Sequence, residues 1–186
     1  MADAYLKTWL IGGVEKCEIK IVDYDADWPR KFERHARIIA DALGCAALRI
    51  EHIGSTSVPQ LAAKPIIDII VVVADSADES SYRAQLEAAG YVLRVREPKW
   101  NEHRMFRTPE KDVHLHIYSA GCREIERTLT FRDRLRRNVD DRRRYEKTKR
   151  ELATNDWPDM NAYAEAKTNV IENLIAAAQA VGEISR

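Results

Sequence analysis

The sequence has few cysteines, no long apolar run and no excess of either charge. Its three scattered cysteines form neither a disulfide framework nor a metal-binding C-x-x-C pair. No apolar stretch approaches the roughly 20 residues that a membrane-spanning helix needs. Charged residues also interrupt the first twenty positions, where a secretory signal would be apolar. We therefore expect a cytoplasmic protein with reduced thiols and no membrane partner.

Charge is balanced overall, with 30 basic and 30 acidic residues, so no global field points to nucleic acid. The balance is uneven along the chain, because residues 123–150 hold 12 Lys or Arg against 6 Asp or Glu. Few aromatic residues interleave with this basic block, which argues against a nucleic-acid groove. An RNA-associated protein that uses the basic block remains one alternative, and a solvated helix face is the simpler interpretation.

Length and pattern predict one domain over residues 1–186, of α/β (α+β) class. We expect a mixed β-sheet flanked by helices over residues 14–122. A helical C-terminal segment, residues 123–186, should pack on this core.

Periodicity places the main helices and a hairpin. A helix capped by Asp25 or Asp27 should run to Gly44, two more should meet near Asn138, and a last one should run from about Asp159 to Val181. Alternating residues in 103–107 and 113–118 predict a hairpin.

The stretch from Glu51 to Val73, EHIGSTSVPQLAAKPIIDIIVVV, concentrates the candidate chemistry. It predicts a strand end, a polar turn at Gly54–Ser57, a short helix that stops by about residue 63, and a buried strand. A Gly-Ser turn that opens a helix presents N–H groups and a positive dipole end to an anion, typically a phosphate. Asp68, the one charged residue of the buried strand, can hold a divalent cation against that phosphate. The other interpretation is a capped helix with Asp68 bonded to nearby amides.

Strand alternation places Asp68, Ile70 and Val72 on one face, and it places His114 and His116 on one face of a later strand. One carboxylate and two imidazoles suit a transition metal better than magnesium. The alternative is a polar pocket in which each ring is hydrogen-bonded to a carboxylate or to backbone.

The Glu51–Val73 stretch resembles the signature of the GrpB family, which is close to HIGSTSVPGLAAKPIID followed by an apolar strand. The resemblance extends from about residue 18 to about 175. Positions similar to the family include FRDRLR at 131–136, Tyr145, Lys149, Tyr163 and Lys167.

GrpB proteins in turn resemble the nucleotidyltransferase superfamily. Its fingerprint is an apolar residue, Gly, then Gly or Ser, a spacer, and two carboxylates separated by one apolar residue. Ile53-Gly54-Ser55, a spacer of twelve residues and Asp68-Ile69 match this pattern. Ile70 stands where the second carboxylate is expected, and Gln60 stands where the GrpB pattern usually has Gly.

The resemblance implies a nucleotidyltransferase-like fold and, if the protein is an enzyme, a divergent metal-dependent nucleotidyltransferase. Asp68 would be its catalytic residue, and Asp68, His114 and His116 would hold Mg²⁺, Mn²⁺ or Zn²⁺. The expected partner is a nucleotide or another small phosphorylated ligand. The residues expected to bind it are His52, Gly54, Ser55, Thr56, Lys64, Arg132, Lys149 and Lys167.

Ile70 favours a different outcome, because it removes the carboxylate that supports a two-metal site. The alternative is a non-catalytic ligand-binding module associated with coenzyme A metabolism. GrpB-like domains also occur fused to dephospho-coenzyme A kinases, and this association alone suggests that role.

Overall fold

In the part of the chain that the structure describes, five strands form one mixed sheet in the order β1-β2-β5-β4-β3. The computed structural model of the chain describes residues 9–15, 18–180 and 182. Among these described strands, only β2 and β5 pair in parallel, and the other neighbours are antiparallel. The strands are β1 (Arg49–Ile53), β2 (Ile67–Val73), β3 (Val92–Glu97), β4 (His103–Arg107) and β5 (Val113–Ser119). The predicted mixed sheet and the hairpin of β4 and β5 are confirmed.

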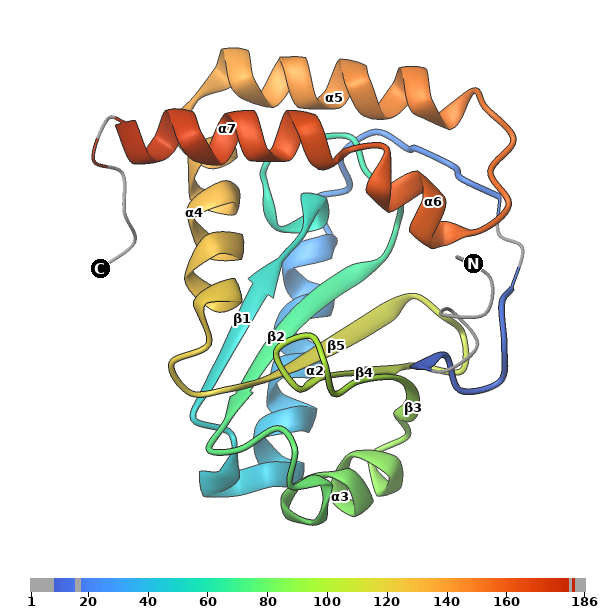
Figure 1. Ribbon diagram of the computed structural model, residues 1–186, viewed down its shortest axis with the longest axis vertical. Coiled ribbons are helices and arrows are strands. Elements are labelled where there is room, and N and C mark those ends of the chain that lie inside the picture. Colours follow the sequence, from blue (N-terminus) through green and yellow to red (C-terminus); the bar gives the residue numbers. More distant parts are fainter. Residues whose placement is uncertain (1–8, 16–17, 181, 183–186) are drawn as a thin grey trace.

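Helices α2 (Trp28–Leu43) and α3 (Arg83–Ala88) cover one face of the sheet (Figure 1). Ile39 and Leu43 of α2 pack in the main apolar core with Ile69 and Val71 of β2. The side chains on one stripe of α2 are buried because that stripe faces the sheet, as the 3.6-residue periodicity predicts.

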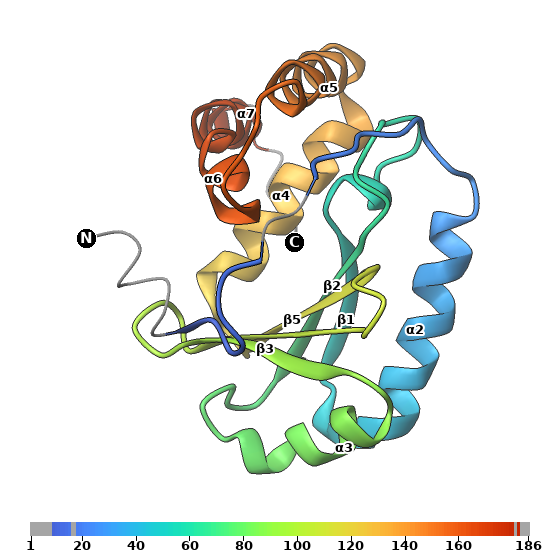
Figure 2. The same ribbon diagram turned by 90° about the vertical axis from the view of Figure 1, so that its right-hand side faces the viewer.

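Helix α4 (Arg123–Arg137) covers the opposite face, and Figure 2 shows α2 and the helical C-terminal segment on the two sides of the sheet. Ile125 and Leu129 of α4 pack against Ile70 and Val72. Helix α5 (Val139–Ala153) follows after Asn138, whose side chain accepts a hydrogen bond from Asp141 N–H. The predicted break at Asn138 is therefore confirmed, and α4 packs on this face of the sheet.

The short helix predicted to end near residue 63 does not form. The structure has only a single 3-10 turn, Ser55–Ser57, and Val58 is already extended. Two residues later, Gln60 has a φ of 65°, which also does not fit a right-handed helix. Ala63 forms a bridge with Val22, while Val58 and Leu61 are buried against the C-terminal helices. Tertiary packing thus outweighs the capping signals, and the segment does not form the helix that they favour.

The prediction of a single last helix is also wrong, because the structure has two helices there, α6 (Met160–Glu165) and α7 (Thr168–Ala180). Tyr163 of α6 is buried beside Trp157, whereas Leu174 of α7 packs with Val58 and Leu135. The break lets each segment bury its own apolar side. Val181, the predicted end, lies outside the described residues.

No helix in the described part of the chain is both long and apolar enough to cross a bilayer. The assignment of residues 1–186 to a single domain stays a prediction.

Candidate metal and anion site

Asp68, His114 and His116 meet on the face of the sheet that carries α4. Because β2 and β5 are parallel neighbours, Asp68 lies directly opposite His114, and Ile70 lies opposite His116. His114 Nδ1 is 3.5 Å and His116 Nε2 is 3.8 Å from Asp68 Oδ1. One ligand atom from each of the three residues lies within 4.8 Å of the others. The sequence therefore identified a group that the fold brings together.

This group fits a divalent transition metal. Two ligands at the ordinary Zn–N or Zn–O distance of a tetrahedral ion are about 3.3–3.4 Å apart, and the carboxylate-to-imidazole distances of 3.5 and 3.8 Å are close to that value. Three protein ligands leave one position open to a water or a substrate oxygen, as in catalytic zinc sites. The same donors accept Mn²⁺, and they suit Mg²⁺ less well because it prefers oxygen ligands.

The Asp68 carboxyl is held ionised. Burial would by itself raise its pKa, but the imidazoles of His114 and His116, which lie 3.5 and 3.8 Å from Asp68 Oδ1, outweigh burial and hold the pKa well below its usual range. The carboxylate side chain is 29% exposed and lines a pocket, so it remains reachable from solvent.

Gly54 lets the turn approach this carboxylate closely. A Cβ added at Gly54 would lie 3.1 Å from the Cβ of Asp68. It would lie closer still to the carboxylate oxygen Oδ2 of Asp68. Gly54 also has φ 67° and ψ −176°, a combination that glycine alone adopts readily. The turn is held by its own bonds, since Ser57 Oγ donates to the Gly54 carbonyl over 2.6 Å. The described structure therefore gives the turn a close contact with Asp68, without the helix that was expected to follow it.

Three lysines gather on the other side of the same pocket, which has a volume of about 220 Å³. Lys64 lies in the segment before β2, Lys149 on α5 and Lys167 between α6 and α7. Lys149 is only 2% exposed, and its Nζ donates to the Ala62 carbonyl. The ammonium groups of Lys64 and Lys167 lie 5.1 and 4.5 Å from the centre of the Tyr163 ring.

Crowding and burial destabilise the charged form of two of these lysines. Burial, followed by the neighbouring Lys167, lowers the pKa of Lys149 to about 7. Burial, followed by Lys64, lowers the pKa of Lys167 to about 8. Like charges held together in a pocket are unfavourable without an anion, so this arrangement is typical of an anion site.

The pocket collects most of the predicted ligand residues. Gly54, Ser55, Lys64, Lys149 and Lys167 line it together with the metal group. Sequence reasoning missed the aromatic and apolar part of the wall, although three of those residues, Phe131, Tyr145 and Tyr163, already stood out as positions similar to the GrpB family. The remaining lining side chains are Ile21, Ile66 and Met160.

Three predicted ligand residues are engaged elsewhere. His52 stacks on Phe32 with ring centres 4.6 Å apart, and its Nε2 is 3.1 Å from Thr56 Oγ1. Burial, followed by the charges of Arg136 and Arg132, lowers the pKa of His52 to about 4 despite Asp68 nearby. Thr56 is 1% exposed and donates to the Ile66 carbonyl over 3.0 Å. Both side chains brace the turn from behind.

Arg132 is committed to carboxylates on the protein. It donates to Glu51 and to Asp133 at 2.7 Å each, and to the His52 carbonyl at 3.1 Å. It anchors α4 to β1, and it does not line the described pocket.

Ile70 is fully buried among Ile53, Val72 and Tyr118 under α4. The site of the missing second carboxylate is thus an apolar contact, and His116 lies next to it on β5. Among the described residues, the ligand group here consists of one carboxylate and two imidazoles.

Comparison with known proteins places these residues in a family context. A family model described as GrpB protein matches residues 18–177. A UPF0157 protein of Halalkalibacterium halodurans is 50% identical over 162 residues, which cover 87% of this chain and 83% of the relative. The conserved protein GrpB from Enterococcus faecalis has a similar crystal structure, with a TM-score of 0.76 and 34% identity over 86% of this chain and 96% of that chain. The crystal structure of the Cid1 poly(U) polymerase aligns with 13% identity and a TM-score of 0.47 over 70% of this chain and 45% of that one.

Proposed function

The chain belongs to the GrpB family, and we propose that its pocket binds a nucleotide or another phosphorylated ligand through a divalent metal ion. One observation carries the proposal: the Asp68–His114–His116 group and three lysines line the same pocket. Neither feature alone is specific, but a metal ion and several ammonium groups converging on one small space match a polyphosphate.

Each set of residues has a distinct role in this proposal. Asp68, His114 and His116 hold the metal, whose open position accepts a phosphate oxygen. Lys149 and Lys167 neutralise the remaining phosphate charge as point charges. Lys64 lies with them on the pocket wall. Gly54 and Ser55 close the pocket beside the metal group, where backbone and hydroxyl donors can reach the ligand.

A neighbouring pocket of about 200 Å³ suits the part of the ligand that carries no phosphate. It shares Ile66, His114 and Met160 with the lysine pocket, so the two spaces meet at the metal group. Its remaining wall includes the apolar side chains of Val95 and Met105 from β3 and β4, and charged side chains such as Arg94 and Arg107 of the same strands. A base or another apolar group could extend along the sheet from the phosphates into this space.

Nucleotidyl transfer is the reaction to test alongside binding. A single metal ion can polarise a phosphate and stabilise the developing charge, whereas a second ion would need the carboxylate that Ile70 replaces. Asp68-dependent release of pyrophosphate from a nucleoside triphosphate would therefore indicate a one-metal transferase. Its absence together with tight binding would indicate a ligand-binding module.

Replacing Asp68→Asn should abolish metal-dependent binding of inorganic tripolyphosphate and of ATP, because the amide is a much poorer metal ligand than the carboxylate. Calorimetry with Mn²⁺ measures this directly. At pH 8, where most imidazole is neutral, the melting temperature of the metal-free variant should be unchanged or slightly higher. The reason is that the change removes a partly buried charge at nearly constant volume.

The matched control is Asp41→Asn, since Asp41 lies exposed on α2, on the other side of the sheet. It should bind as the wild type does. A large loss of melting temperature in metal-free Asp68→Asn, with no tripolyphosphate binding by the wild type, would overturn the proposal. Binding of tripolyphosphate as tight as that of ATP would contradict the role of the second pocket alone.

A further inference from the structure

A second layer of polar side chains lies behind His116. The Nδ1 of His116 is 3.1 Å from Nε2 of His103, and Nδ1 of His103 is 2.7 Å from a carboxylate oxygen of Glu97. His116 Nε2, on the far side of the ring, is the atom that faces Asp68. Glu97, His103, His116 and Asp68 thus form one continuous chain across β3, β4, β5 and β2.

The chemistry of these groups sets the proton positions. An ionised carboxylate can only accept hydrogen bonds. The proton of the hydrogen bond between His103 and Glu97 is therefore bonded to Nδ1 of His103. In a neutral His103 ring, Nε2 is then an acceptor, and His116 Nδ1 must supply the proton of that second bond. His116 Nε2 is left without a proton, with its lone pair directed at Asp68. That is the form of imidazole that binds a metal ion.

The surroundings of His103 fix the orientation of its ring. His103 is 5% exposed and stacks on Tyr118, with ring centres 4.9 Å apart. Trp100 packs edge-on against it at 5.3 Å. Contacts on two sides prevent the ring from turning.

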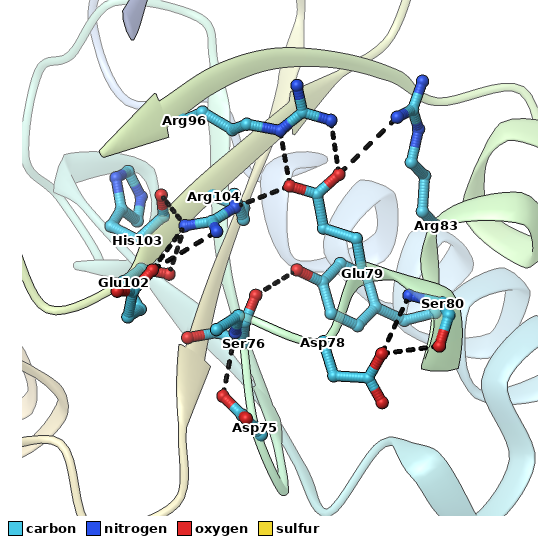
Figure 3. Close-up of polar contacts among 12 residues, drawn as sticks. Asp75, Ser76, Asp78, Glu79, Ser80, Arg83, Arg96, Glu102, His103 and Arg104 are labelled. Carbon is cyan, nitrogen blue, oxygen red and sulfur yellow. Dashed lines mark hydrogen bonds and ion pairs between the residues drawn. The ribbon is translucent and has the colours of Figure 1, made fainter. Parts of the chain in front are cut away.

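The neighbouring ends of β3 and β4, which carry Glu97 and His103, are anchored by a separate set of polar contacts around Glu79, as Figure 3 shows. Arg96 and Arg104 are cross-strand neighbours, and Glu79 accepts from Arg96 at 2.5 Å and from Arg104 at 2.8 Å. Arg104 is 5% exposed and also donates to the Glu102 carbonyl over 2.9 Å. Glu97 and His103 are the next cross-strand pair along β3 and β4. The alignment of Glu97 and His103 therefore rests on a partly buried ion network next to them.

We propose that Glu97 and His103 are positioning residues for the metal site, which hold His116 with a bare Nε2 directed toward Asp68. The inference rests on the proposed function, since it concerns the metal that the pocket would bind. It assigns a role to two residues that do not line the lysine pocket. It also names the ligand atoms, Nε2 of His116 and Nδ1 of His114, which are the two nitrogens nearest to Asp68 Oδ1.

The proton position can be read without any metal. Long-range ¹H–¹⁵N correlation spectra of metal-free protein labelled at histidine should show His116 protonated on Nδ1 and not on Nε2, at pH 8. A spectrum with the proton of His116 on Nε2 would overturn the inference, whatever the protein binds.

The consequence for metal binding is tested with three variants and Co²⁺, whose visible spectrum reports the ligand set. His103→Leu removes the acceptor behind His116 and should weaken Co²⁺ binding by about 10- to 100-fold, the usual effect of losing such a partner. His103→Gln places an amide oxygen near the former Nε2 and should restore most of the affinity. His35→Leu is the matched control, because His35 is also buried but bonds to the Tyr91 hydroxyl over 2.7 Å in the α2 layer. It should leave Co²⁺ affinity unchanged.

The outcomes separate this inference from the proposed function. Co²⁺ binding that Asp68→Asn abolishes and His103→Leu leaves intact would overturn the positioning role alone. No Co²⁺ binding by the wild type would overturn both. Equal losses in His103→Leu and His103→Gln, with a bare Nε2 retained in both spectra, would also contradict it, because hydrogen bonding to His116 would then not be the cause.

Discussion

Lys149 and Lys167 are cations that the ligand-free pocket holds unfavourably. With pKa values of about 7 and about 8, both lie below the ordinary lysine value of 10.5, so the fold favours their neutral forms. The stability of the ligand-free protein should therefore rise with pH between about 7 and 10.5, where the unfolded chain binds more protons. A bound polyanion reverses this preference because it stabilises the ammonium forms.

Binding of Mn²⁺ and tripolyphosphate at pH 8.5 should accordingly take up about one to two protons from the buffer. Calorimetry in two buffers with different heats of ionisation measures that number, and affinity should fall as the pH rises above 8. Lys149→Met should remove about half of the uptake, because Lys167 supplies the rest. Lys147→Met is the control, since the Lys147 side chain is 79% exposed on the same helix. Equal heats in both buffers would contradict a role for these lysines.

At the scale of elements, β3 and β4 are held in place by one carboxylate on the segment before α3. Hydrogen bonding from Arg96, opposed by burial and reinforced by Arg104, lowers the pKa of Glu79 from 4.5 to about 2. A carboxylate whose pKa is depressed in the fold stabilises it above the unfolded value of about 4.5, and this contribution is lost as the pH falls toward 2. The Glu79 side chain is 17% exposed, so solvent screens the network only in part.

Glu79→Gln should therefore destabilise the protein by about 2–3 kcal/mol at pH 7, and by progressively less as the pH falls toward 3. Urea denaturation at both pH values measures the change. Glu87→Gln removes an i,i+4 partner of Arg83 whose side chain is 42% exposed, so it should cost less than about 1 kcal/mol. Equal effects of the two substitutions would show that the Glu79 network does not stabilise the strand pair.

At the scale of the whole molecule, the pocket has two halves from distant parts of the chain. The sheet supplies Asp68, His114 and His116, while the helical C-terminal segment supplies Lys149 and Lys167. A ligand that bridges metal and lysines must contact both. We expect that binding couples the stability of the two parts.

Mn²⁺ with tripolyphosphate should slow hydrogen exchange in β2 and β5 and, together with them, in α5, α6 and α7. At a free ligand concentration of 100 Kd the stabilisation should be about 2.7 kcal/mol. Lys149→Met should lose the protection of both parts at the same ligand concentration, and α3 should be unaffected in either protein. Protection restricted to β2 and β5 would mean that the lysines do not share the ligand with the metal group.

The sequence by itself determined the periodic elements and the face on which the metal group stands. A stripe at helical spacing identified α2, the Asn138 signal separated α4 from α5, and alternation placed Asp68 with Ile70 and Val72. These features depend on contacts along one element, so local patterns suffice. The resemblance to the GrpB family added Lys149 and Lys167, which no local pattern distinguishes from other basic residues of the helices.

The tertiary structure alone decided the rest. No helix forms after Ser57, because Val58 and Leu61 are buried against residues such as Leu135 and Leu174 that are distant in the sequence. Gln60 adopts a positive φ, which suits the glycine that the GrpB pattern usually has there. Arg132 bonds to Glu51 and does not line the pocket. His103 lies within hydrogen-bond distance of His116 because β4 pairs with β5. Such pairings are set by which strands and helices become neighbours, and spacing along the chain carries no record of that choice.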